Sequence, residues 1–148
     1  MKFFFALVAT MLLGGCMHAG HHGGGHYADG QERTLRNRVV IQVSDADPAR
    51  WNLALNNAKN LQSDLGAANV DIEIVAYGPG INMLKADSVV ATRIADAVNA
   101  GVKVVACENT MRNSKLTKAE MSTAVGYVPA GVVEIMQKQS EGWAYLRP

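Results

Sequence analysis

Three short runs rich in β-branched residues constrain the fold of this chain more than any other feature. They are RVVIQV at residues 38–43, DIEIVAY at 71–77 and VKVVAC at 102–107. Each run has the length of a strand, and a stretch with apolar residues at helical spacing separates it from the next. Strands that alternate with helices in this way predict a parallel sheet with helices on both of its faces.

The helical stretches between these runs carry their own start and stop signals. Asp47 is the expected N-cap of the first helix, with Pro48 at its first position and Gly66 after its end. Asp87 or Ser88 is expected to cap the second helix. The chain of 148 residues has room for one domain with a substantial core. The expected fold class is therefore α/β, a single-domain, flavodoxin-like, doubly wound sheet.

Further elements are expected after the third strand. Thr117 and Glu120 have the spacing of a capping box, which opens a short helix. A short strand is predicted at 125–128, a helix from Pro129 onward and a terminal strand at 143–146. The apolar residues of this last helix are Val132, Val133 and Met136.

The N-terminal segment resembles a bacterial lipoprotein signal. A cationic start and the apolar run 3–13 precede a Leu-Gly-Gly site before Cys16. The run is too short to span a bilayer. We therefore expect removal of residues 1–15 as a signal peptide and lipidation of Cys16, with ordinary secretory cleavage as the alternative. The expected location is therefore the periplasm-facing cell envelope. Because Met17 rather than Asp follows the cysteine, the resemblance to known sorting patterns favours the outer membrane.

Residues 16–36 are expected to form a flexible tether. All four histidines of the chain lie in this segment, and glycine separates most of them, a composition that cannot bury enough apolar surface to fold. Imidazoles in one short loop can share a copper, zinc or nickel ion, although no acid or thiol lies among them. We favour a solvated spacer over a metal site. The candidate metal ligands are His18, His21, His22 and His26.

Charge and motif content exclude several classes of function. Fourteen basic and thirteen acidic residues give a formal charge of +1, and no basic stripe is present. Nucleic acid is therefore not an expected partner. No run follows a strand with the glycine spacing of a dinucleotide or triphosphate site, so no cofactor is expected.

Cys107 is the candidate reactive residue. It ends the third run, and the carboxyl ends of parallel strands border the ligand crevice of such sheets. Backbone amides and Arg112 would favour its thiolate, whereas Glu108 would oppose it. No histidine lies in the folded domain, which disfavours a Cys-His hydrolase. The alternative is a buried cysteine that only fills space. The expected crevice residues are Tyr77, Gly78, Pro79, Gly80, Asn109, Thr110 and Arg112.

Short motifs are spread over residues 37–148: QVSD at 42–45, WN at 51–52, NN at 56–57, NL at 60–61, AYGPG at 76–80, ACENT at 106–110, VPAGV at 128–132 and GWAY at 142–145. Together these motifs resemble the DsrE/DsrF-like family. The resemblance implies a DsrE-like α/β subunit that assembles into trimers or hexamers. In the sulfur-relay members a cysteine after a central strand carries a persulfide between proteins, and Cys107 has that position here. The implied function is an envelope-anchored carrier of sulfane sulfur, or sulfurtransferase-like protein, that meets a donor or acceptor protein. The alternative is a non-catalytic subunit for assembly or for binding a small ligand or metal.

Overall fold

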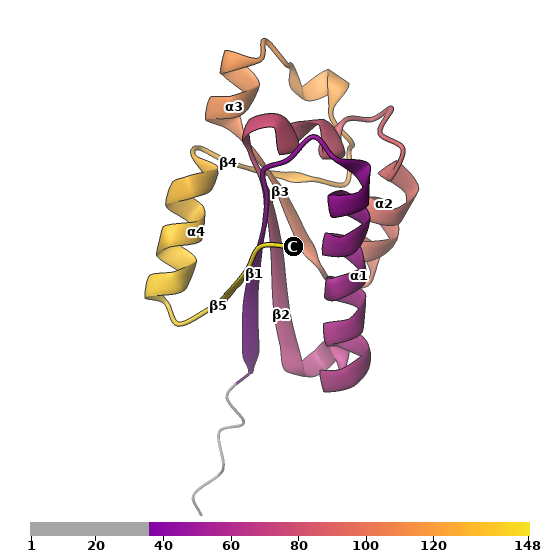
Figure 1. Cartoon of the computed structure of the whole chain (residues 1–148), viewed down its shortest axis with the longest axis vertical. Helices are drawn as coiled ribbons and strands as arrows, with labels where there is room; N and C mark the ends of the chain where they lie inside the picture. The colour runs from indigo at the N-terminus through magenta and orange to yellow at the C-terminus, as the bar shows by residue number, and fades with distance from the viewer. Residues whose placement is uncertain (1–35) are drawn as a thin grey trace, which may run out of the picture. The chain divides into compact units, whose positions relative to one another are not determined.

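The computed structural model describes residues 36–148, so Cys16 and the four histidines lie outside the described residues. The predicted α/β architecture is confirmed. Five strands form one sheet in the order β4-β3-β2-β1-β5, and every neighbouring pair is parallel (Figure 1). The strands are β1 (Asn37–Val43), β2 (Val70–Ala76), β3 (Lys103–Cys107), β4 (Gly126–Val128) and β5 (Ala144–Leu146).

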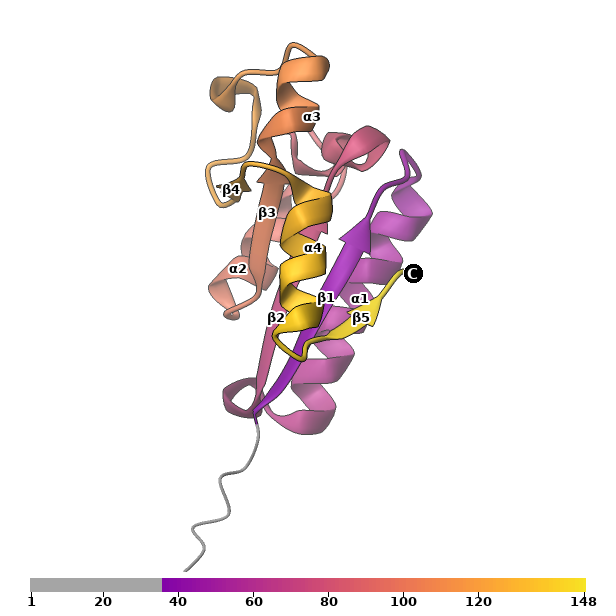
Figure 2. The same ribbon diagram turned by 90° about the vertical axis from the view of Figure 1, so that its left-hand side faces the viewer.

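Helices cover both faces of this sheet, as Figures 1 and 2 show from two sides. The helices α1 (Pro48–Leu65) and α2 (Ala91–Asn99) pack on one face, and α4 (Gly131–Ser140) packs on the other. The short helix α3 (Glu108–Asn113) follows β3 at the carboxyl end of the sheet. None of the helices within residues 36–148 is long and apolar enough to cross a membrane. Three 3-10 helices complete the fold: η1 (Ala67–Asn69), η2 (Gly78–Leu84) and η3 (Lys118–Glu120).

The first helix begins where its sequence signals place it, and the second does not. The Asp47 side chain accepts a hydrogen bond from Ala49 N at 2.9 Å, which confirms the predicted N-cap of α1. The prediction that Asp87 or Ser88 caps α2 is wrong, because α2 begins only at Ala91. The Ser88 side chain instead accepts a bond from Val90 N, so it closes a separate turn that lets Val90 enter the core.

Two apolar clusters lie on the two faces of the sheet. The larger cluster fills the space between the sheet and α1 and α2, and includes Ile41, Ile74 and Ile94. The smaller cluster lies under α4 and consists of Val40, Val75, Val105, Val128 and Ile135. The apolar core is therefore smaller on the face of the sheet that α4 covers.

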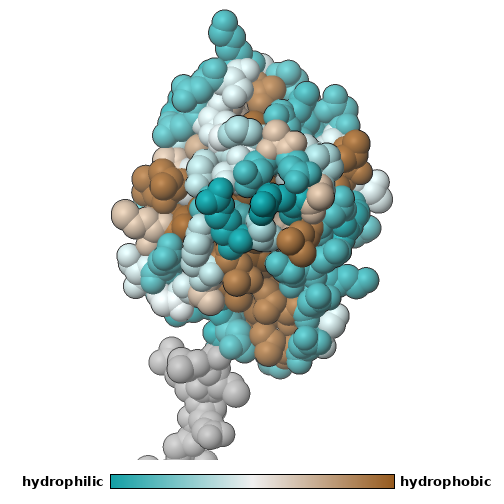
Figure 3. Space-filling model, in the orientation of Figure 1, coloured by the Kyte–Doolittle hydropathy of each residue, from teal (hydrophilic) through white to brown (hydrophobic). Residues whose placement is uncertain are grey.

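The apolar residues predicted for the last helix do not form its buried face. Ile135 contacts the sheet, whereas Val132 and Met136 are 62% and 61% exposed and Val133 is also exposed. In the space-filling view a group of apolar atoms lies at the left edge, on the side where Figure 1 shows α4 (Figure 3). The outer side of α4 is therefore an exposed apolar surface.

Candidate functional site

Cys107 is the last residue of β3 and the N-cap of α3. β3 lies between β2 and β4 in the sheet, so the cysteine sits at the carboxyl edge near its centre. The chain that leaves β2 leads to α2 on one face, and the chain that leaves β4 leads to α4 on the other. Connections that diverge in this way leave a crevice at the strand ends, which is where α/β proteins bind ligands.

The Cys107 sulfur accepts hydrogen bonds from two backbone amides. Gly131 N, at the start of α4, lies 3.2 Å from Sγ, and Thr110 N, within α3, lies 3.4 Å from it. The Thr110 hydroxyl oxygen accepts a bond from Gly78 N at 2.9 Å, so its proton is free to point toward the sulfur. One distant segment therefore contacts the thiol directly through Gly131, and a second one, through Gly78, contacts Thr110 beside it.

Gly131 brings α4 close enough to reach this sulfur. A Cβ atom at this position would lie 3.1 Å from Tyr77 Cβ, 3.2 Å from Val75 Cγ1 and 3.3 Å from Cys107 Cβ. With any larger residue at this position, the helix or its neighbours would have to move by a few tenths of an ångström. Sequence reasoning missed the role of this residue, since the VPAGV segment was interpreted as a helix start and as a family motif, and not as a contact of Cys107. The available signal was a glycine in the first turn of a helix, where backbone N–H groups lack intrahelical partners.

Opposing effects set the pKa of the Cys107 thiol. Cys107 is 4% exposed, and burial raises its pKa. Hydrogen bonds from the Thr110 side chain and from the backbone of Gly131, Thr110 and Asn109 lower it, and together they bring the pKa below its ordinary value. Neutral donors rather than a cationic side chain thus stabilise the thiolate.

The charged neighbours of Cys107 in sequence point elsewhere. The Arg112 guanidinium donates to the Asn109 side chain, and both residues are exposed. Glu108, which was expected to oppose ionisation, pairs with Lys118 Nζ at 3.2 Å. Its negative charge is therefore balanced within α3 and η3.

A groove of about 460 Å³ lies beside the thiol contacts. Among the expected crevice residues, the structure places Gly78, Pro79 and Thr110 in it. Tyr77 lies instead against Gly131, on the side of α4. Gly80 is buried, and a Cβ there would lie 2.3 Å from the Val43 carbonyl oxygen. The groove is lined by Gly78, Pro79, Ile81, Asn82, Thr110, Asn113, Ser114 and Leu116.

No group of three or more His, Cys, Asp or Glu side chains within residues 36–148 could hold a metal ion. The candidate ligands His18, His21, His22 and His26 lie outside that range. The metal hypothesis therefore stays a prediction from the sequence.

Comparison with known proteins gives a family and several similar solved structures. The family described as DsrE/DsrF-like matches residues 37–148. Among curated proteins, none matches the chain. A protein of unknown function from Methanobacterium thermoautotrophicum, MTH1491, is 38% identical with a TM-score of 0.72, over 76% of this chain and 99% of that one.

Two other solved structures are more distant in sequence. BT1422 of Bacteroides thetaiotaomicron, a conserved protein of unknown function, is 14% identical with a TM-score of 0.64, over 78% of this chain and 98% of its own. The ychN protein of E. coli is 15% identical with a TM-score of 0.61, over 76% of this chain and 99% of its own. At this level of identity, the two structures show the fold alone.

Proposed function

The chain belongs to the DsrE/DsrF-like family, and on that premise we propose that Cys107 carries sulfane sulfur as a persulfide. The family suggests a role related to sulfur relay. One observation carries the proposal for this chain: the sulfur at the end of β3 accepts two backbone N–H groups, and its pKa is lowered although it is buried. Sulfur transfer requires a thiolate, which these contacts favour.

The proposed transfer needs only a donor that contains a sulfane sulfur. The Cys107 thiolate attacks the outer sulfur of a donor persulfide, RSSH. An S–S bond forms at Cys107 while the donor S–S bond breaks, and RS⁻ leaves with the bonding electron pair. An acceptor thiolate then attacks the outer sulfur on Cys107 and releases the Cys107 thiolate. The amides of Gly131 and Thr110 stabilise the negative sulfur both as nucleophile and as leaving group.

Burial of Cys107 favours a second candidate function. At 4% exposure the thiol has the accessibility of a core residue, as a non-catalytic binding or assembly subunit would have. The two functions differ in one requirement, because only sulfur transfer needs a path to Sγ. We assign that path to the groove beside Thr110, which belongs both to the groove lining and to the contacts of the sulfur.

Intact-mass measurement separates these two functions. The reduced chain, with Cys16→Ser to leave one cysteine, is incubated with polysulfide or thiosulfate. The sulfur-carrier function predicts a gain of one sulfur atom that a reducing agent removes. The matched control is Cys107→Ser in the same background, which should gain nothing. A chain that keeps Cys107 and still gains no sulfur from either donor would support the non-catalytic function.

We also propose that this chemistry takes place at the cell envelope, in a homo-oligomer. The location rests on the lipoprotein-like signal that ends at Cys16. Self-assembly is supported by the exposed apolar side of α4, where Val132 and Met136 are more than half exposed. A donor or acceptor of sulfur would then have to meet the protein outside the cytoplasm.

A further inference from the structure

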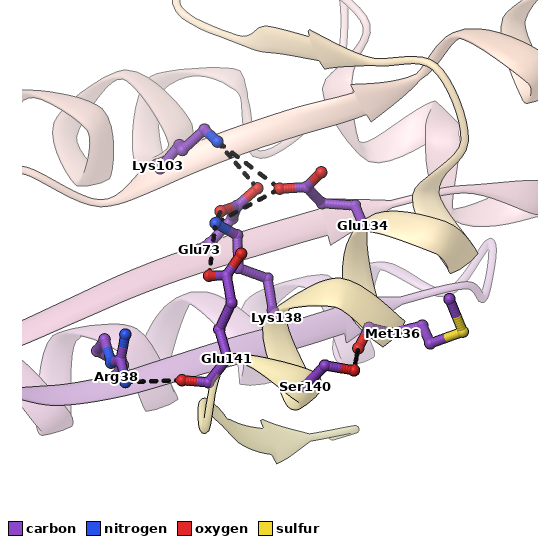
Figure 4. Close-up of polar contacts among 8 residues, drawn as sticks. All are labelled: Arg38, Glu73, Lys103, Glu134, Met136, Lys138, Ser140 and Glu141. Atoms are coloured by element: carbon purple, nitrogen blue, oxygen red, sulfur yellow. Dashed lines mark hydrogen bonds and ion pairs between the residues drawn. The ribbon is translucent and has the colours of Figure 1, made fainter.

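The face of the sheet under α4 contains a cluster of four charged side chains, shown in Figure 4. Glu73 on β2 is 0% exposed and is the only charged residue of the described chain that is buried. Its Oε1 lies 3.2 Å from Lys103 Nζ of β3, and its Oε2 lies 3.5 Å from Lys138 Nζ of α4. Glu134 of α4 lies 3.9 Å and 3.7 Å from the same two ammonium groups. These four residues, the Glu73 cluster, have no net charge.

Other polar groups surround the Glu73 cluster on its outer side. Glu141, just after α4, lies 3.8 Å from Lys138 Nζ, and its backbone oxygen accepts a bond from Arg38 of β1. The Trp143 ring lies 4.7 Å from the same ammonium group. Burial raises the pKa of Glu73, whereas its two lysine partners act to lower it. A buried carboxylate of this kind depends on its partners, because a charge left without one is costly in the interior.

The sheet-facing residues of α4 connect this cluster to the thiol. They are Gly131, Glu134, Ile135 and Lys138, at the i, i+3, i+4, i+7 spacing of one helix face. Gly131 contacts Cys107 at one end, and Lys138 contacts Glu73 two turns away, about 10 Å along the axis. Ile135 is the only large apolar side chain that α4 buries. The apolar packing of α4 on the sheet thus comes from Gly131 and Ile135, and the Glu73 cluster adds ion pairs to it.

We propose that Glu73 is a positioning residue for the Cys107 thiol. Through Lys138 it fixes α4 against the sheet and so keeps the Gly131 N–H at the sulfur. This inference rests on the proposed function in treating Cys107 as the reacting group. If α4 loosens, the sulfur loses one of its donors while it stays in an apolar site, and the thiolate becomes less favourable.

A direct electrostatic effect of Glu73 on the thiol would shift the pKa of Cys107 in the opposite direction. Removal of the negative charge of Glu73, with α4 unmoved, would reduce repulsion on the thiolate and lower the pKa of Cys107. Loss of positioning raises that pKa. A residue that only stabilises the fold would change the free energy of unfolding and leave the thiol pKa as it was. The pKa of Cys107 therefore distinguishes the three roles.

The test is the pH profile of iodoacetamide alkylation in the full chain with Cys16→Ser. Glu73→Gln keeps the shape of the side chain and removes its charge. We expect the midpoint of the profile to move to higher pH, and the rate at about pH 6.5 to fall about threefold to tenfold, since one unit of pKa corresponds to a tenfold change.

Two lysine variants provide the matched comparison. Lys103→Met and Lys138→Met each remove one positively charged partner of the Glu73 carboxylate, but only Lys138 lies on α4. We expect Lys138→Met to shift the midpoint upward clearly more than Lys103→Met does. These variants also carry the test if Glu73→Gln does not fold.

Either of two results would overturn the inference. One is a folded Glu73→Gln protein whose midpoint is unchanged or lower. The other is an equal shift in the two lysine variants. The alkylation assay contains no sulfur donor. A protein that accepts no sulfur would therefore refute the proposed function, but the comparison of alkylation profiles among the variants would remain valid.

Discussion

The substitution Gly131→Ala adds one methyl group where α4 meets the strand ends. The new Cβ would lie 3.1 Å from Tyr77 Cβ, 3.2 Å from Val75 Cγ1 and 3.3 Å from Cys107 Cβ. Ordinary contact begins at 3.4 Å, so the worst overlap is 3.4 − 3.1 = 0.3 Å. The contacted atoms lie at or next to the backbone of β2 and β3, or just after β2, and have little freedom to move. The helix must therefore move outward.

Two effects of opposite sign set the change in stability. Overpacking of a close contact costs about 1–3 kcal/mol. Replacing glycine by alanine restricts the unfolded chain and returns about 0.4–1 kcal/mol, since Gly131 does not have a positive φ. We expect a net loss of about 1–2 kcal/mol in the free energy of unfolding. The same movement lengthens the Gly131 N to Sγ distance from 3.2 Å toward about 3.5 Å, which raises the pKa of Cys107.

Urea unfolding measures the first effect, and the pH profile of alkylation measures the second. Gly126→Ala is the matched control, because a Cβ there would lie 3.4 Å from Val105 Cγ1 and 3.8 Å from the Val104 carbonyl oxygen. This control should stay within about 0.5 kcal/mol of the wild type. A Gly131→Ala protein that is as stable as the control, with the wild-type alkylation profile, would refute the packing argument.

Three further predictions concern pH, anchoring and assembly. The pKa of Cys107 is lowered in the folded protein, so the unfolded chain binds the thiol proton more tightly. The wild type should therefore have a higher free energy of unfolding than Cys107→Ser. This difference should be full above the ordinary pKa of 9.0 and be lost as pH falls through the folded pKa. Urea unfolding at several pH values tests this, and a constant difference would contradict it. Cys16→Ser should release the protein from the membrane fraction, unless the wild type is already soluble with an N-terminus other than residue 16. Met136→Glu on the exposed side of α4 should dissociate the proposed oligomer, which light scattering measures. A wild-type protein that is monomeric at micromolar concentration would contradict this prediction.

The elements that sequence predicts best are those with local causes. β1 and α1 follow from an apolar run and from the Asp47-Pro48 start, which act within a few residues. The start of α2 was misplaced because Val90 enters the core and delays the helix, which no local pattern encodes. The apolar residues of α4 include Val132, Val133 and Met136, but the local pattern does not tell which residues face the sheet, and the large apolar residue that α4 buries is Ile135.

The site follows the same division. The place of Cys107 at a strand end could be predicted from its own run of residues. The contact of Gly131 with the sulfur could not be predicted, because it joins positions that are 24 residues apart. Glu73 gave a signal that went unused: an acidic residue in a central strand covered on both faces must be buried. Its partners Lys103 and Lys138 come from other elements, so only the fold identifies them.

The burial of Cys107 also limits where a transferred sulfur can lie. The Gly131 N–H lies 3.2 Å from Cys107 Sγ, and a Cβ on Gly131 would lie only 3.3 Å from Cys107 Cβ, so an outer sulfur that pointed toward α4 would displace the helix. A direction that leaves α4 in place is toward Thr110, which lines the groove and whose hydroxyl oxygen accepts a hydrogen bond from Gly78 N. Otherwise α4 must move, and that movement would have to work against the ion pairs of Lys138 with Glu73. The contacts that favour the thiolate are therefore the same contacts that restrict access to it. If Cys107 carries sulfur as we propose, the donor would have to enter from the side of the groove.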